Sequence, residues 1–230
     1  MTLGAIFRKT VTVAIYALAV AMVLKEAGFD IGPILAGAGV VGLAVGFGAQ
    51  NLVRDVISGL FLLVENQIRV HDVVNINGTG GLVEEINLRT TVLRGLDGAV
   101  HIFPNGSIQT LSNLTREYSY YVFDIGVSYM EDTDHVASVM EEVADGLRSD
   151  AVYGPLILDP LEVLGVERFG ESAVHLKARI KTKPIQQWRV GREMNRRLKK
   201  RFDELGIDLP YPQRTIHVAP SLADKAAKNA

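Results

Sequence analysis

The sequence contains no cysteine, and charged residues are scarce in its first 64 positions. The absence of cysteine excludes a disulfide scaffold, a zinc site built from thiolates and a cysteine nucleophile. The 24 Lys and Arg residues nearly balance the 26 Asp and Glu residues, so the chain has no general attraction for nucleic acid. Residues 1–64 hold only seven of these charges, and the chain therefore divides near Glu65 into an apolar part and a polar part.

Two uncharged runs in the apolar part predict membrane spans. The longer run, residues 31–53, has 23 residues, which in a helix is enough to cross the roughly 30 Å hydrocarbon core. The shorter run, residues 10–24, is framed by Lys9 and Lys25, whose side chains can snorkel to the interface. A cleaved signal peptide is the alternative for the shorter run, but its small alanines lie inside the apolar stretch rather than after it.

Basic residues predict the orientation of the two spans. Arg8 and Lys9 precede the first span, while Arg54 and the polar part follow the second. Because Lys and Arg are enriched on the cytoplasmic side, both ends of the chain are expected there. The expectation is a multi-pass protein of the plasma (inner) membrane with a cytoplasmic C-terminal domain.

The second span contains an unusual number of small residues, six glycines and four alanines. At 100° per residue, a ridge formed by Leu43 and Phe47 lies between two unlike flanks. One flank consists of Gly39, Gly42 and Gly46, and the other of Ala36, Val40 and Ala44. Unlike flanks that fit each other make a head-to-tail contact, which closes into a ring of identical helices. The ridge would then point into the ring.

The charge pair Arg54 and Asp55 interrupts the apolar sequence after this span. It predicts that the span ends near Gln50 and Asn51 and that a second, amphipathic helix lies along the membrane surface. Gly59 would give that helix a flexible point. One long helix leaving the membrane is the alternative.

The polar part is predicted to hold two domains. Residues 70–108 read as short strands separated by turn residues at Gly78–Gly81, Asp97-Gly98 and Asn105-Gly106, typical of a five-stranded, Sm-like small barrel. Strand and helix periodicities beyond residue 113 give the order β-α-β-β-α-β of an α+β ferredoxin-like domain, with helices at 133–147 and 185–205 and a last strand at 215–218. The expected boundaries are 1–64, 65–112 and 113–218, followed by a disordered tail at 219–230.

Other functional interpretations have less support in the sequence. The match of residues 37–42 to a dinucleotide fingerprint lies within a predicted span, and the Gly78 loop lacks the lysine of a phosphate loop. The five histidines are scattered, and no serine lies in a nucleophile elbow. The basic helix 189–201 raises RNA binding, but its apolar residues at core spacing favour a solvated face. We therefore expect no enzyme activity, metal, cofactor or nucleic-acid partner.

Three segments resemble the small-conductance mechanosensitive channel family, the MscS-like channels. They are GLAVGFGAQNLVRDVISGLFLL (Gly42–Leu63), LRTTVLRGLDGAVHIFPNGSI (Leu88–Ile108) and DLPYPQ (Asp208–Gln213), and they occur in the family's order. The resemblance runs from about Ala5 to Val218. It implies a homoheptamer with a pore-lining helix, a kink, an interfacial helix, a β domain and an α/β cytoplasmic cage with side portals. It also implies at least one more span ahead of the two seen here.

The resemblance also assigns individual residues. Leu43 and Phe47 fall on the two pore constrictions, and the two flanks fall on the helix-packing faces, where Val40 replaces a small residue. Asn51 stands where the best-known members carry the kink glycine, so the bend could be centred at Gly59.

The function implied by the resemblance is a channel opened by membrane tension. It would release ions and small osmolytes with weak selectivity during hypo-osmotic shock, with membrane lipids as partners and without catalysis. The alternative is a membrane-tethered oligomeric binding module that uses the basic helix 189–201.

Overall fold

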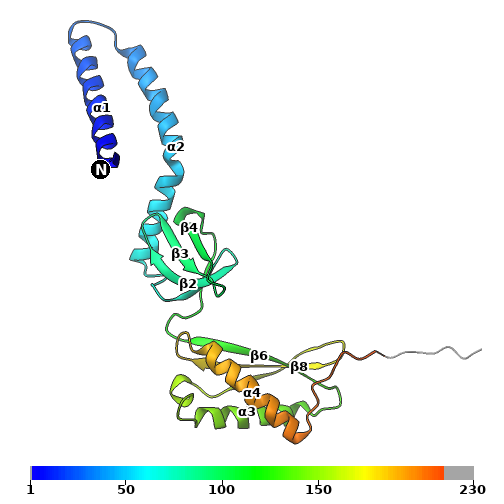
Figure 1. Ribbon diagram of the computed structural model, residues 1–230. Coiled ribbons are helices and arrows are strands. Elements are labelled where there is room, and N and C mark those ends of the chain that lie inside the picture. The colour runs from blue at the N-terminus through cyan, green and yellow to red at the C-terminus, as the bar shows by residue number, and fades with distance from the viewer. Residues whose placement is uncertain (1, 215–230) are drawn as a thin grey trace, which may run out of the picture. The chain divides into compact units, whose positions relative to one another are not determined.

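The computed structural model describes residues 2–214, which divide into two compact units. Over the described residues, the first unit contains 2–66 together with 86–92 and 102–108. The second contains 67–85, 93–101 and 109–214. Figure 1 shows the elements of both units along the chain.

The first unit contains two long helices, α1 (Thr2–Glu26) and α2 (Gly32–Val64). Gly28, with a φ of 83°, follows the end of α1 in the left-handed conformation that glycine tolerates. The start of α2 is favoured by Pro33 in its first turn and by the Asp30 carboxylate, which accepts a hydrogen bond from the Gly32 N–H at 2.9 Å. Among the described residues, α2 is the one helix that is both long enough and apolar enough to cross a membrane.

The predicted division of this region into two helices near Asn51 is wrong, because α2 continues without a break from Gly32 to Val64. Residues 50–64 contain no proline, and a single glycine lowers helix propensity by only about 1 kcal/mol. The charge pair at Arg54 and Asp55 therefore lies within one continuous helix and does not mark its end.

Five strands follow α2, which is the predicted number, although the fifth lies beyond the predicted range 70–108. They are β1 (Val73–Ile76), β2 (Thr79–Ile86), β3 (Thr90–Arg94), β4 (Val100–Pro104) and β5 (Leu111–Asn113), in the sheet order β4-β3-β2-β1-β5. The β1–β2 hairpin turns at Asn77 and Gly78, whose φ angles of 52° and 87° suit a two-residue turn. The predicted Gly78–Gly81 loop is therefore too long, since residues 79–81 belong to β2.

The two other predicted turns have different outcomes. Asp97 and Gly98 lie in the loop between β3 and β4, where the Gly98 N–H donates to the Gly95 carbonyl. The prediction of a hairpin turn at Asn105 and Gly106 is wrong: these residues begin a short 3-10 helix, η1 (Asn105–Ser107), and both are buried. Their position results from contacts with α2, which local turn propensity cannot reveal.

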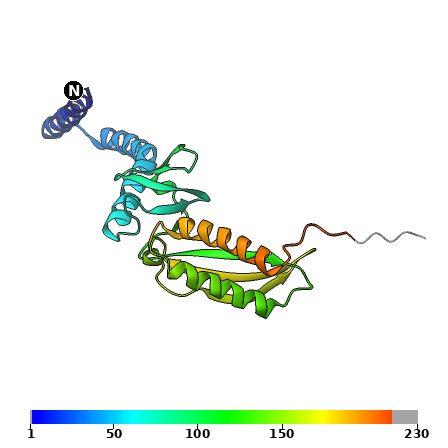
Figure 2. The same ribbon diagram turned by 60° about the horizontal axis from the view of Figure 1, so that its bottom comes forward.

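The α+β domain has the predicted order β-α-β-β-α over the described residues. Its elements are β6 (Ser119–Val127), α3 (Thr133–Arg148), a 3-10 turn η2 (Gly154–Leu156), β7 (Glu162–Phe169), β8 (Val174–Thr182) and α4 (Gln187–Leu205). The strands pair in the order β6-β8-β7, and α3 and α4 lie side by side on one face of this sheet (Figures 1 and 2). The predicted last strand at 215–218 and the tail at 219–230 lie outside the described residues.

The core of this domain follows the predicted alternation of β8. Leu176, Ala178 and Ile180 are buried among apolar residues of both helices, including Met140 and Met194. Helix α4 begins two residues later than predicted because Ile185 has a φ of 71°, which a helix cannot contain.

Candidate pore helix

The two ridge residues of α2 are exposed in the single chain. Leu43 exposes 63% and Phe47 exposes 74% of its surface. Beside them runs a shallow hollow of about 640 Å³, whose lining includes Gly39, Gly42 and Gly46. The structure thus places the predicted ridge and the predicted glycine flank next to each other on one side of α2.

The glycine flank has no packing role within the chain as described. A Cβ atom built on Gly39, Gly42 or Gly46 would meet nothing within 4 Å in the described part of the chain. Opposite them, the flank of Ala36, Val40 and Ala44 is also exposed. Both flanks are therefore open to other helices, and their assignment to helix packing stays a prediction.

The C-terminal half of α2 is fixed by a buried carboxylate. Asp55 is only 8% exposed, and its Oδ1 accepts a hydrogen bond of 2.9 Å from the backbone N–H of Gly106 in η1. Its Oδ2 lies 3.8 Å from Nη1 of Arg89. A charged acceptor makes a stronger hydrogen bond than a neutral one, typically about 1.5–3 kcal/mol. Asp55 therefore ties α2 to the segment that follows β4.

Gly106 is required at this contact. A Cβ atom there would lie 2.7 Å from Oδ1 of Asp55 and 2.9 Å from Cγ of Arg54, closer than carbon atoms approach other heavy atoms. The predicted hinge residues Gln50, Asn51 and Arg54 are all exposed on α2. Of these, Arg54 borders the contact with Gly106.

Asn105 holds the η1 segment in place beneath α2. Its side chain is 1% exposed, and its Nδ2 donates to the carbonyl oxygens of Asn87 and Leu88 at 2.8 and 3.0 Å. Its Oδ1 accepts a hydrogen bond of 2.8 Å from the hydroxyl of Thr91. Every polar atom of the amide group is thus used, which makes the position of η1 specific.

Gly59 lies where α2 approaches this segment most closely. A Cβ atom on Gly59 would overlap the carbonyl oxygen of Leu88 and the side-chain nitrogen of Asn105. The structure thus gives Gly59 a packing role that the sequence analysis did not predict, and its role as a hinge stays a prediction. Asp55, Asn105 and Gly106 were also missed as a group, because nothing in their spacing shows that they meet.

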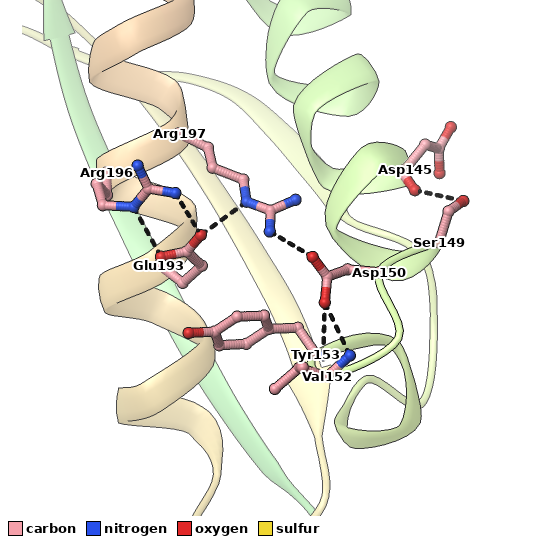
Figure 3. A network of polar contacts seen from close by, with 8 residues as sticks. All are labelled: Asp145, Ser149, Asp150, Val152, Tyr153, Glu193, Arg196 and Arg197. Carbon is pink, nitrogen blue, oxygen red and sulfur yellow. Dashed lines mark hydrogen bonds and ion pairs between the residues drawn. The ribbon is translucent and has the colours of Figure 1, made fainter.

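The basic face of α4 is largely neutralised by carboxylates of its own domain. Glu193 receives hydrogen bonds from Nε of Arg196 and Nε of Arg197, both at 2.8 Å, and Arg197 also donates to Asp150 at 2.6 Å (Figure 3). The two guanidinium groups lower the pKa of Glu193 to about 2. Arg197 likewise lowers the pKa of Asp150. These pairs support the interpretation of α4 as a solvated, ion-paired face.

Comparison with known proteins covers nearly the whole chain. Residues 9–50 match the family model "Mechanosensitive ion channel, transmembrane helices 2/3", and residues 51–116 match "Mechanosensitive ion channel, beta-domain". Residues 121–209 match "Mechanosensitive ion channel MscS, C-terminal". The chain belongs to the MscS-like family of mechanosensitive ion channels.

Individual relatives agree with this assignment. The chain is 40% identical over 218 residues to the small-conductance mechanosensitive channel of Caldanaerobacter subterraneus, covering 94% of this chain and 75% of that protein. It is 34% identical over 220 residues to the moderate conductance mechanosensitive channel YbiO of Escherichia coli, covering 95% of this chain but 30% of that protein. The closed-state crystal structure of Helicobacter pylori MscS shares its fold, with a TM-score of 0.76 and 23% identity over 93% of this chain and 83% of that one.

These findings confirm the family, the fold class and the general function predicted from the sequence. The chain is an MscS-like membrane protein with N-terminal transmembrane helices, and the function supported is that of a channel opened by membrane tension. The alternative, a tethered binding module, is not favoured. The relatives of this chain given above are named as mechanosensitive channels and not as enzymes.

Proposed function

We propose that the chain forms a homo-oligomer, a heptamer by family resemblance, in the plasma (inner) membrane, with residues 65–218 in the cytoplasm. In this proposal residues 1–64 form the membrane part, 65–112 the β domain, 113–218 the cage and 219–230 a tail. Membrane tension opens a pore lined by α2, which releases ions and small osmolytes with weak selectivity during hypo-osmotic shock. Lipids are the other partners, and nucleic acid is not one.

The observation that carries this proposal is the exposed apolar ridge beside an open glycine flank on α2. Leu43 and Phe47 expose most of their surface, and a hollow lined by three glycines runs beside them. Lipid can cover apolar side chains on any side of a membrane helix, so the flank of small residues is what distinguishes this side, because it allows a second helix to approach closely. A ring of such helices would bring the ridges together as two apolar collars around a central pore.

Two apolar collars can close a pore without blocking it sterically. Water leaves a narrow passage lined by leucine and phenylalanine because those side chains offer it no hydrogen bonds. An ion cannot shed its hydration shell there, so the dry collar stops conduction. Tension that moves the helices apart widens the collar, and the pore then fills with water.

The anchored half of α2 supplies the fixed point for such a movement. Asp55 and Gly59 hold α2 against the segments around Leu88 and Asn105. The exposed stretch Gln50–Arg54 lies between this anchor and the gate. We place the bend that accompanies opening in this stretch, with Asn51 at its centre; a bend at Gly59 is the alternative, and it would require the contact of α2 with Leu88 and Asn105 to open.

The test is patch-clamp recording of the purified full chain reconstituted into liposomes. Suction should open discrete channels that close when suction is released, and protein-free liposomes should remain silent. Single-channel currents of similar size in potassium chloride and potassium glutamate would support weak selectivity. The absence of suction-dependent openings in patches shown to contain the protein would refute the proposal.

A further inference from the structure

Helix α2 carries only two charged residues over its whole length, Arg54 and Asp55. They are adjacent in sequence but have different surroundings. Asp55 is buried against η1, where its Oδ1 accepts the hydrogen bond from the Gly106 N–H and its Oδ2 lies 3.8 Å from Nη1 of Arg89. Its negative charge is therefore directed toward η1 and partly offset by a neighbouring cation.

Arg54 is exposed, and its charge is not offset within the described chain. No carboxylate of residues 2–214 forms an ion pair with its guanidinium group. An arginine stays positively charged under all physiological conditions. The exposed surface of α2 therefore carries one positive charge and no negative charge.

Arg54 lies on the same side of α2 as the predicted gate residues. Because α2 is one continuous helix, residues separated by whole turns share a side. Arg54 follows Leu43 by about three turns and Phe47 by about two, so its direction around the helix axis falls between theirs. Asp55 points about 100° away from Arg54. The ridge formed by Leu43 and Phe47 thus continues to Arg54.

The hollow beside the ridge extends to the same level of α2. Its lining begins at Gly39 and continues past Phe47 to Gln50 and Val53. Gln50 lies about one turn beyond Phe47, so the side of α2 that carries the ridge changes there from apolar to polar. In a ring of helices that pack along this hollow, the ridge faces the pore as far as Arg54.

The position of Arg54 along α2 is below both apolar collars. Arg54 lies about 10 Å beyond Phe47 along the helix axis, where the polar side chain of Gln50 retains water. A bend centred at Asn51 displaces Arg54 little, because it lies only about 4.5 Å further along the axis. Rings of arginine or lysine are the feature by which anion pores attract anions and repel cations.

We propose that the Arg54 side chains of all subunits form a ring of positive charge at the cytoplasmic mouth of the pore and give the open channel a preference for anions. This role requires an oligomer whose pore is lined by α2, so it rests on the function proposed above. The preference grows as salt is diluted, because the Debye length increases from about 8 Å at 0.15 M to about 30 Å at 0.01 M.

The test is the reversal potential of suction-activated currents from the full chain in liposomes, under a gradient of dilute potassium chloride. Chloride should permeate at least about twice as readily as potassium. Arg54→Gln should lower this permeability ratio to about 1, whereas Arg54→Lys keeps the charge and should retain most of the preference.

A variant with the charge moved to another side of α2 is the matched control. Val56 is exposed and points about 160° away from Arg54. The double variant Arg54→Gln/Val56→Arg therefore has the net charge of the unmodified chain but no charge on the ridge. Its permeability ratio should equal that of Arg54→Gln.

Chemical modification of Arg54→Cys gives a second measurement. The unmodified chain has no cysteine, so a methanethiosulfonate reagent can react only at position 54 of this variant. A cationic reagent should restore the preference for chloride, and an anionic reagent should reverse it. Neither reagent should change the currents of the unmodified chain.

Three results would overturn the role of Arg54. The first is equal permeation of chloride and potassium through the unmodified channel in dilute salt. The second is an unchanged permeability ratio in Arg54→Gln or in the double variant, compared with the unmodified chain and with Arg54→Gln respectively. The third is the same ratio in Arg54→Cys after reaction with either reagent. In all three cases suction still opens the channel; a complete lack of suction-activated currents would instead refute the channel function and this role with it.

Discussion

Replacing Gly59 by alanine should loosen the attachment of α2 to residues 86–92 and 102–108. The added methyl group would overlap the Leu88 carbonyl oxygen and Nδ2 of Asn105, so α2 or the segment beneath it must move. Such a movement lengthens the hydrogen bond of 3.0 Å between Asn105 and Leu88. The substitution therefore acts on a contact that is buried and fully satisfied.

The magnitude follows from three effects. Forcing an extra methyl group into a packed contact costs about 1–3 kcal/mol, and weakening a buried hydrogen bond adds about 1 kcal/mol. The higher helix propensity of alanine returns about 1 kcal/mol. The local free energy of opening should fall by about 1–3 kcal/mol, which corresponds to roughly 5- to 150-fold faster exchange of protected amides.

Hydrogen–deuterium exchange of peptides that cover residues 86–92 and 102–108 measures this effect. Gly48→Ala is the matched control, because it changes the same helix where a Cβ atom meets nothing within 4 Å of the described chain. Gly48→Ala should leave the exchange of both segments unchanged. If Gly59→Ala also leaves it unchanged, the close approach of α2 to Leu88 does not exist in the channel and the argument for an anchored helix fails.

Three further predictions follow from the same contacts and charges. Asp55→Ala should destabilise the α2–η1 contact by about 1–3 kcal/mol, because it leaves the buried Gly106 N–H without an acceptor. Asp55→Asn retains an acceptor and should destabilise the contact less. Hydrogen exchange of the Gly106 amide measures both effects, and equal exchange in the two variants would contradict the role of this hydrogen bond. The pKa of Glu193, about 2 instead of 4.5, means that its stabilisation is complete above about pH 5 and is lost as the pH falls toward 2. Glu193→Gln should therefore reduce the acid-dependent loss of thermal stability by about 1–2 kcal/mol after allowance for solvent screening, and an unchanged pH profile would show that the ion pairs are not formed. Gly46→Leu should fill the hollow beside Phe47 and reduce cross-linking of the oligomer, while Val45→Leu, on another side of α2, should not; intact cross-linking in Gly46→Leu would refute the packing face.

Periodicity and charge distribution were sufficient to predict most of the fold. The strict alternation along β8 identified its buried face, and the uncharged run before Arg54 identified the main part of α2. Both signals are local, because they depend on which side of one element faces the core. The five-stranded sheet followed from turn residues in the same way.

Tertiary contacts explain the features that the local sequence patterns did not reveal. Asn105 and Gly106 have the composition of a hairpin turn, yet they form η1 because Asp55, 51 residues from Gly106 in sequence, accepts a hydrogen bond there. Gly59 suggests flexibility by its residue type, and its role as a hinge stays a prediction; the structure adds that its missing side chain makes room for Leu88 and Asn105. Gln187 also gave no signal in the sequence, because its Oε1 lacks a hydrogen-bond partner among the described residues only as a result of burial.

The most direct test of the central claim is the tension needed to open channels that carry serine in the ridge of α2. Leu43→Ser or Phe47→Ser should wet the collar, lower the opening tension in patch-clamp recordings and produce currents without suction, because a hydroxyl group holds water where an apolar side chain does not. Leu43→Met, which keeps the collar apolar at similar size, should open at the tension of the unmodified channel. Normal opening tension in both serine variants, together with leakage in Val41→Ser or Val45→Ser, would show that another side of α2 lines the pore.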